Sequence, residues 1–364
     1  MKLKPIVLAL PFVTALAQAA PVTDACFNCP SLDRIADAQT FNDAIYYSQV
    51  TDAINAGLAA SEIKNRLSTT LQLNHKVLTY SEVWTALTVT DQDPANSDNV
   101  LLLYKGTSLA KFSNGSGSQS SNPDNWNREH VWAKSHGFSS SDLEAYTDIH
   151  HLRPTDISVN ASRGNLDFDN SDAPLAEAPS NRIDDDSFEP RDTVKGDVAR
   201  MLLYMDTRYQ GSDLTPDLQL VDRITKTGEP ALGRLCRLLE WHSNDPVDSL
   251  ESNRNNAIYE FQGNRNPFID HPEWVDVLYT ATACSNNGGG EEPTDPGNGD
   301  GGDNGDGNAS VAPLFISEYV EGSSYNKAIE LYNPNSTEID LRANLYKLGR
   351  FNNGGTSPSF ISLT

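Results

Sequence analysis

The sequence is short of basic residues. Its 364 residues include 27 Lys and Arg against 50 Asp and Glu, which gives a formal net charge of −23. Proteins that hold nucleic acid on a broad electrostatic surface are usually basic, because the neutralised phosphates supply most of the affinity. The composition therefore disfavours such a surface. Contact with a polyanion would have to be local, through a few arginines and a divalent cation.

Long apolar runs are also missing beyond the N-terminus. There, two lysines precede an apolar run from Ile6 to Leu16, and Ala17-Gln18-Ala19 follows in the small-x-small pattern that a signal peptidase cuts. We expect residues 1–20 to be a removed export signal, because the run is too short for a transmembrane anchor and contains Pro11. The mature protein is then expected to be secreted, with the periplasm as the alternative, and to have no membrane span.

Cysteine is scarce, with four in the whole chain: Cys26, Cys29, Cys236 and Cys284. In an exported protein this number favours two disulfides over free thiols. Three pairings are open, and we expect Cys26 with Cys29 and Cys236 with Cys284. A structural zinc site is the alternative, but one C-x-x-C pair followed by two distant cysteines is poor zinc spacing.

Residues 285–309 contain no large apolar side chain and are rich in Gly, Asp and Asn. We expect a flexible acidic linker there. Strand-like runs at 314–320 and 328–332 follow within residues 310–364. Because an immunoglobulin-like sandwich needs about 100 residues, we expect this C-terminal module to be a partial β-sandwich and the chain to be a fragment.

Residues 21–284 are expected to form one mainly helical domain of the α+β class. Apolar residues at i, i+3, i+4 and i+7 predict core-facing helices over 198–205 and 232–239. The apolar run 100–104 predicts a buried strand. Residues 113–122 are rich in Gly and Ser and predict a disordered loop.

Residues 126–132 place a carboxylate next to an imidazole, in the order Asn127, Arg128, Glu129, His130. Hydrolysis of a phosphodiester needs a base that deprotonates water and a cation that takes up charge on the phosphoryl oxygens. A histidine, with an ordinary pKa of about 6.5, can be that base. Mg²⁺ needs few protein oxygens because it keeps several waters.

The adjacency of Glu129 and His130 is a geometric difficulty. Neighbours on a regular strand point to opposite faces. The two side chains can share one site only if the strand is strongly twisted, is bulged, or ends there.

A second segment of interest spans residues 148–165. Pro154 is placed to start a helix, which puts Asn160 inside that helix. Because Asn is mildly unfavourable in the middle of a helix, a role as a cation ligand would explain its position. The alternative is an Asn that faces solvent.

Together these two segments resemble the endonuclease I family of secreted and periplasmic nucleases, which belongs to the ββα-metal, or His-Me finger, group. The resemblance covers most of residues 24–284 and includes the segments 196–205 and 262–269. It implies a ββα-metal finger within the mainly helical domain. It also implies that His130 is the general base and that Glu129 and Asn160 bind one divalent cation, Mg²⁺, with Mn²⁺ or Ca²⁺ as alternatives.

The family also has an arginine that contacts the scissile phosphate. Arg163 is our first candidate for that catalytic role, followed by Arg128 and Arg153. Asn127 is expected to support the site, and His150 and His151 are expected either to support it or simply to pack beside it.

The implied reaction is hydrolysis of DNA by a monomer, with little sequence preference and 5′-phosphate ends, and RNA is left open as a second substrate. A non-catalytic extracellular DNA-binding protein is the alternative, and it would lack the base or the ligands. A metalloprotease is disfavoured because neither H-E-x-x-H nor H-x-x-E-H occurs. Residues 315–333 resemble the opening strands of a lamin tail domain, which suggests a targeting or binding role.

Overall fold

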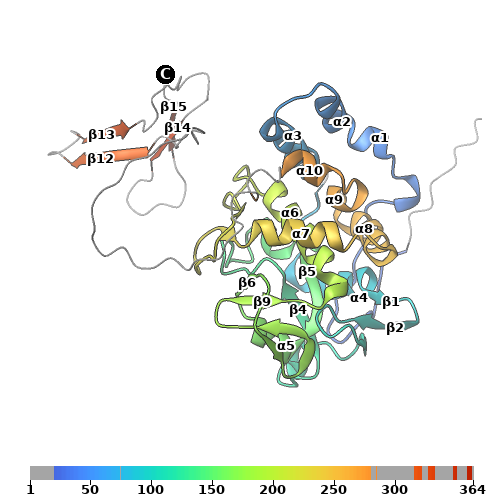
Figure 1. Ribbon diagram of the computed structural model, residues 1–364. Helices are drawn as coiled ribbons and strands as arrows, with labels where there is room; N and C mark the ends of the chain where they lie inside the picture. The colour runs from blue at the N-terminus through green and yellow to red at the C-terminus, as the bar shows by residue number, and fades with distance from the viewer. Residues whose placement is uncertain are drawn as a thin grey trace, which may run out of the picture. The chain divides into compact units, whose positions relative to one another are not determined.

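The computed structural model divides the chain into two compact units, Met1–Gly290 and Glu291–Thr364. It describes residues 20–73, 75–279 and Cys284 of the first unit, and four strands of the second (Figure 1). Most of the expected export signal and all of the expected linker lie outside the described residues.

The second unit contains two strand pairs. β12 (Phe315–Glu321) pairs antiparallel with β13 (Lys327–Tyr332), and β14 (Lys347–Arg350) pairs antiparallel with β15 (Ser359–Ser362). The strands predicted at 314–320 and 328–332 are present as β12 and β13. The partial sandwich and the lamin tail resemblance stay predictions.

Helices make up most of the regular structure described in the first unit. The α-helices are α1 (Asp43–Tyr46), α2 (Ser48–Asn55), α3 (Ala60–Gln72), α4 (Tyr80–Thr90), α5 (Ile157–Arg163), α6 (Lys195–Arg208), α7 (Leu235–Asn244), α8 (Ser249–Gln262), α9 (Pro267–Asp270) and α10 (Trp274–Leu278). Single 3₁₀ turns are η1 (Ala38–Thr40), η2 (Gly117–Gln119), η3 (Glu144–Thr147) and η4 (Asp192–Val194).

The strands of the first unit are short and form small separate sheets. They are β1 (Gln92–Asp93), β2 (Asn96–Leu101), β3 (Ser108–Ala110), β4 (Trp126–His130), β5 (Leu152–Asp156), β6 (Asp167–Phe168), β7 (Ala173–Leu175), β8 (Ala178–Ile183), β9 (Ser187–Glu189), β10 (Gln219–Leu220) and β11 (Ala231–Leu232). The sheet orders are β1-β2-β3, β4-β5, β6-β9-β8-β7 and β10-β11. The unit is therefore mixed α+β, with more helix than strand.

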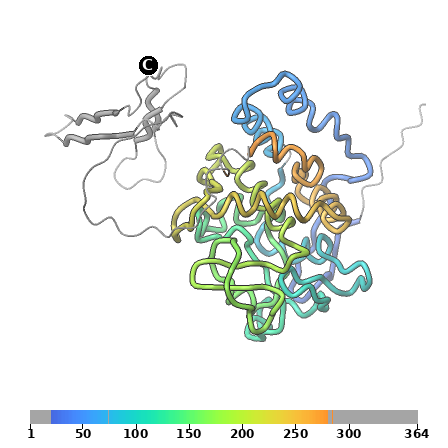
Figure 2. Tube along the Cα trace, in the orientation of Figure 1, coloured from blue at the N-terminus to red at the C-terminus, as the bar shows by residue number. Residues whose placement is uncertain are grey.

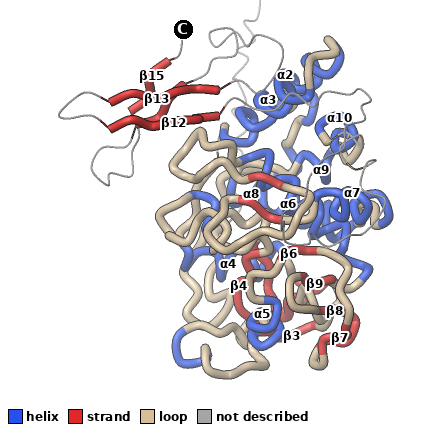
Figure 3. The backbone as a smooth tube through the Cα atoms, turned by 60° about the vertical axis from the view of Figure 1, so that its left-hand side comes forward, coloured by secondary structure: helices blue, strands red, loops and turns tan. Residues whose placement is uncertain are grey.

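The two kinds of structure gather at different ends of the first unit. Helices α1–α3 and α9–α10 lie at one end, and β4, α5 and the β6–β9 sheet lie at the other (Figures 1 and 3). The start and the end of the unit lie side by side, since α3 contacts α10 (blue against orange in Figure 2). None of the helices in the described part of the chain is both long and apolar enough to cross a membrane.

Helix α6 runs through the middle of the core. It is buried on nearly every side, and its apolar residues belong to one large cluster with those of α3, α7 and α10. Gly196 allows the close approach of α6 to the end of α7, because a Cβ there would collide with the carbonyl oxygen of Asp245. The disulfides Cys26–Cys29 and Cys236–Cys284 have the expected pairing, and the second ties the end of the unit to α7.

Most predicted elements are present, with shifted ends. The helix predicted over 198–205 is part of α6. The helix predicted over 232–239 begins only at Leu235, because Leu232 pairs in β11. The strand predicted over 100–104 ends at Leu101, and the following residues are buried in a turn.

The prediction of disorder for residues 113–122 is wrong. The segment is a loop, but Asn114 and Ser116 are buried and both donate hydrogen bonds to the carbonyl oxygen of Phe27. These bonds attach the loop to the N-terminal segment that contains the Cys26–Cys29 disulfide.

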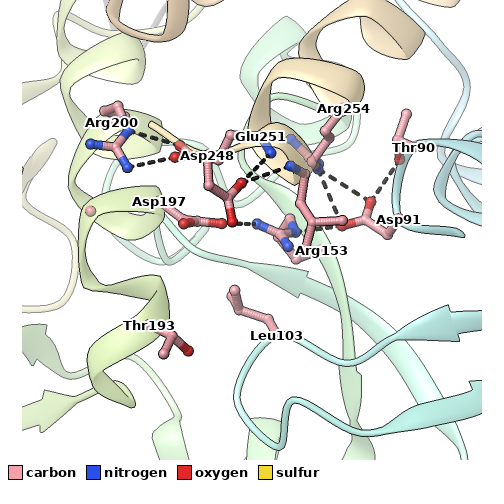
Figure 4. A network of polar contacts seen from close by, with 12 residues as sticks. Thr90, Asp91, Leu103, Arg153, Thr193, Asp197, Arg200, Asp248, Glu251 and Arg254 are labelled. Carbon is pink, nitrogen blue, oxygen red and sulfur yellow. Dashed lines mark hydrogen bonds and ion pairs between the residues drawn. The ribbon is translucent and has the colours of Figure 1, made fainter. Parts of the chain in front are cut away.

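A network of buried charges connects α4, β5, α6 and α8 (Figure 4). Arg153 Nε lies 2.5 Å from Asp91, and Arg254 Nε lies 3.2 Å from the same carboxylate. Arg200 forms a two-point ion pair with Glu251 at 2.8 and 2.5 Å. Arg254 also donates to the carbonyl oxygens of Ile149, His150 and Leu152, at the start of β5.

We expect Arg254→Met to lower the free energy of unfolding by about 3–5 kcal/mol, because it leaves a buried carboxylate and three carbonyls short of donors. All five tryptophans are buried in the first unit, so their fluorescence in urea reports the unfolding of that unit. Arg66→Met is the control, because Arg66 pairs with Glu62 on an exposed helix face and its loss should cost less than about 0.5 kcal/mol. Equal effects of the two substitutions would contradict this account of the network.

Candidate active site

Strands β4 and β5 and helix α5 follow the order strand, strand, helix. β4 pairs antiparallel with β5 over its whole length, with Glu129 opposite Arg153 and His130 opposite Leu152. α5 begins directly after β5. We call this the β4–β5–α5 unit.

Helix α5 contains Asn160 at its middle, as the sequence predicts. Its start differs from the prediction, because Pro154 lies within β5 and the helix begins at Ile157. The N-cap is Asp156, whose carboxylate accepts hydrogen bonds from the backbone N–H groups of Ser158 and Val159.

A cleft of about 400 Å³ runs beside β4 and is lined by Asn127, Arg128, Glu129, His130 and Asn160 among others. Consecutive residues of the strand thus line one cleft. In the described chain the second edge of β4 is bridged only at Trp126, so the cleft can lie along that open edge. This arrangement answers the difficulty that neighbouring residues point to opposite faces.

Glu129 is 1% exposed and carries the carboxylate of the cleft. The hydroxyl of Tyr104 donates to its Oε1 at 2.7 Å, and Arg163 Nη1 lies 3.5 Å from the same oxygen. Burial raises the pKa of Glu129, and the nearby Arg163, Tyr104 and the His130 N–H oppose that rise. Burial likewise raises the pKa of Tyr104 well above 10, so its hydroxyl keeps its proton and donates.

His130 is held in one tautomer. Its Nε2 lies 2.9 Å from the carbonyl oxygen of Tyr146. Because a carbonyl only accepts, Nε2 carries the proton and Nδ1 is the basic nitrogen. Burial, and next the neighbouring His151, lower the pKa of His130 well below 6.5. The imidazole is therefore neutral and able to accept a proton at neutral pH.

Asn160 is oriented by Asn127. Its Nδ2 donates to Asn127 Oδ1 at 2.7 Å, across the gap between α5 and β4. The amide nitrogen of Asn160 is thereby used within the protein, and its Oδ1 is the atom that can serve a ligand in the cleft.

Arg163 occupies a place different from that expected of a phosphate contact. It is 0% exposed, and it donates to the carbonyl oxygens of His130 and Val131 at 3.2 and 2.8 Å. Its guanidinium also lies over the ring of Phe168. Arg163 thus supports β4 and Glu129 from within the core.

Arg153 also lies away from the cleft, since it belongs to the charge network with Asp91 and Asp197 beside another cavity of about 360 Å³. Of the three candidate arginines, Arg128 lines the cleft. Its guanidinium lies 3.4 Å from the ring centre of Tyr80 and 4.1 Å from that of Trp84.

The structure adds three residues that sequence reasoning did not single out. Lys134 and Tyr80 line the cleft, and Tyr104 contacts Glu129. The position of Lys134, four residues after His130, is a signal that could have been used. Tyr80 and Tyr104 precede the motif by many residues, and nothing in the local pattern indicates their contact with it.

His150 and His151 are both buried beside the site. His151 donates through Nε2 to the carbonyl oxygen of Ala145. The next residue, Tyr146, accepts the hydrogen bond of His130. The ring of His150 packs on Tyr204. His151 is thus a packing neighbour of His130, with their ring centres 5.5 Å apart.

Within the described residues, three carboxylates could also be considered for a metal: those of Asp124, Asp156 and Glu177, whose ligand atoms lie within 4.8 Å of one another. Lys105 Nζ lies 2.7 Å from Asp156 and 2.7 Å from Glu177. The Lys105 ammonium therefore already forms ion pairs with two of these three carboxylates.

The cleft brings a carboxylate, a neutral imidazole and an amide oxygen together on a strand-strand-helix unit of an α+β domain. This is the set of groups expected of a phosphodiester hydrolase. Residues 59–273 match the Endonuclease I family, and the chain belongs to that family.

Three relatives are similar to this chain. An extracellular ribonuclease of Bacillus amyloliquefaciens is 48% identical over 260 residues, which are 71% of this chain and 83% of the relative. An extracellular ribonuclease of Bacillus subtilis (strain 168) is 55% identical over 206 residues, 56% of this chain and 70% of the relative. An extracellular deoxyribonuclease of Aeromonas hydrophila is 30% identical over 128 residues, 34% of this chain and 48% of the relative.

The buried histidines should make stability depend on pH. Burial lowers the pKa of His75 to about 4, of His150 to about 3 and of His151 to about 4. Their unfolded pKa is about 6.5, so the stability they contribute is present above pH 6.5 and is lost as the pH falls towards 4. Each histidine adds a slope of up to about 1.4 kcal/mol per pH unit.

We therefore expect the urea midpoint of the first unit to fall between about pH 6.5 and pH 4. His75→Asn should flatten the slope, because it removes one titrating group and keeps an acceptor for the Arg208 guanidinium, which donates to His75 Nδ1 at 3.0 Å. A midpoint that is constant over this range would contradict the expectation.

Proposed function

We propose that this protein is a secreted, divalent-metal-dependent endonuclease that hydrolyses phosphodiester bonds of nucleic acid with little sequence preference. The observation that carries the proposal is the cleft that gathers Glu129, His130 and Asn160. The names of the relatives support export and nuclease activity. Those names include both ribonucleases and a deoxyribonuclease, so we propose DNA and RNA as the two substrates to be compared.

The donor set fits a hard divalent cation. A carboxylate and an amide oxygen suit Mg²⁺, with Mn²⁺ and Ca²⁺ as alternatives. We propose that Glu129 Oε2 and Asn160 Oδ1 hold the cation. The other polar atoms of these two side chains, Glu129 Oε1 and Asn160 Nδ2, already make hydrogen bonds within the protein. When bound, the cation supplies positive charge for the phosphoryl and leaving oxygens.

His130 is the proposed general base. Its Nδ1 takes a proton from the attacking water, while the bond from Nε2 to the Tyr146 carbonyl keeps the ring in the required tautomer. Attack in line with the 3′ oxygen as leaving group gives 5′-phosphate and 3′-hydroxyl ends.

Arg128 and Lys134 are the proposed phosphate contacts. Both line the cleft, and both can meet a phosphate locally although the chain as a whole is acidic. The rings of Tyr80 and Trp84 hold the Arg128 guanidinium in place. Arg163, the first candidate from the sequence, is proposed instead to support Glu129 from the core.

A non-catalytic binder of extracellular DNA remains the alternative. It would keep the fold and lose the base or the cation ligands. Glu129, His130 and Asn160 are all present and lie in one cleft, which favours the enzyme.

We expect the protein to nick supercoiled plasmid and to cut RNA in the presence of Mg²⁺, and to lose both activities with EDTA. His130→Ala and Glu129→Gln should each lower kcat by at least about 100-fold, because they remove the proton acceptor and a cation ligand. End-labelling of the products should detect 5′-phosphates. Cleavage that survives both EDTA and His130→Ala would refute the mechanism.

We expect Arg128→Gln and Lys134→Gln each to raise KM and to reduce the slope of log KM against log salt by about one, because each removes one phosphate contact. Arg66→Gln is the matched control, since Arg66 lies on an exposed face and pairs with Glu62. Unchanged KM and salt slopes in both cleft variants would rule out these two contacts.

A further inference from the structure

Tyr104 lies 25 residues before Glu129 and outside both sequence motifs, yet it contacts the carboxylate of the cleft. Its hydroxyl and the Arg163 guanidinium approach the same oxygen, Oε1 of Glu129, at 2.7 and 3.5 Å. Both groups reach it from the core, where Tyr104 and Arg163 are each 0% exposed. These two side chains leave the second oxygen, Oε2, for a ligand.

The position of the Tyr104 hydroxyl is set by packing on several sides. Its ring packs on Phe188 with centres 4.8 Å apart. Its carbonyl oxygen accepts a hydrogen bond from Asn181 Nδ2 at 2.8 Å. The preceding residue, Leu103, donates its N–H to the carbonyl oxygen of Pro154 in β5 at 2.9 Å. These contacts fix the hydroxyl relative to the strand that pairs with Glu129.

We propose that Tyr104 is a positioning residue for the cation: by holding Oε1 of Glu129 it directs Oε2 to the cleft and raises the affinity for the divalent ion. The inference rests on the proposed metal site. Partners that orient a metal ligand typically contribute about 10–100-fold in metal affinity, because the ligand otherwise has to be ordered when the metal binds.

The test is Tyr104→Phe in the full chain, which removes the hydroxyl and keeps the ring. Mn²⁺ is the probe, and its binding is followed by the electron paramagnetic resonance signal of the free ion. We expect the Kd for Mn²⁺ at the cleft to rise about 10–100-fold. Tyr47→Phe is the matched control, because it removes a buried hydroxyl that donates to the Asp270 carboxylate at 2.9 Å, away from the cleft, and it should leave the Kd unchanged.

A second readout separates positioning from a general loss of structure. Cleavage rates measured against Mn²⁺ concentration should shift to higher concentration in Tyr104→Phe and reach the parent rate at saturation. A variant that is merely damaged would be slower at every Mn²⁺ concentration, and that result would overturn the inference.

Glu129→Gln gives the background from other acidic groups, such as those in residues 285–309. If the parent binds no more Mn²⁺ than Glu129→Gln, the proposed metal site itself fails. If the parent does bind more and Tyr104→Phe equals the parent, the role of Tyr104 fails while the proposed function stands. If Tyr104→Phe does not fold, Phe188→Leu is the second variant, because it keeps the Tyr104 hydroxyl and loosens the packing of the Tyr104 ring. We expect it to raise the Kd for Mn²⁺, and an unchanged Kd would overturn the inference.

Discussion

One buried carboxylate, that of Asp148, attaches the segment just before β5 to helices α6 and α8 of the core. Its Oδ2 accepts hydrogen bonds from Tyr204 and Tyr209, within and just after α6, and its Oδ1 accepts one from Gln262 at the end of α8. Burial alone would raise the pKa of Asp148, but the nearby histidines and the Gln262 donor hold it well below its usual range. The segment that fixes His130 is thereby attached to two core helices.

Local patterns in the sequence were sufficient for the class, for most of α6 and for the place of Asn160 in a helix. The ends of elements were less predictable, because Leu232 pairs with a distant strand and Pro154 continues β5. Which of the candidate arginines lines the cleft could not be predicted from local pattern. Arg163 donates to the carbonyl oxygens of His130 and Val131, whereas Arg128 lies over Tyr80, and both arrangements depend on packing between segments far apart in the chain.

Glu129 and His130 are neighbours on one strand, and both line the same cleft. A regular strand separates Glu129 from His130 by face, and a second paired strand at the open edge would have kept them apart. The cleft is lined by both, together with Asn160 from α5. Under the proposed function, the same cleft would present Arg128 and Lys134 to a phosphate although the protein as a whole is acidic.

The Cys236–Cys284 disulfide has a mechanical consequence. A pull on the chain beyond Cys284 passes through this covalent bond into the start of α7, so α8, α9 and α10 lie inside a closed loop that the force bypasses. Helix α8, whose Arg254 and Gln262 hold the residues before β5, is thus kept out of the path of such a force.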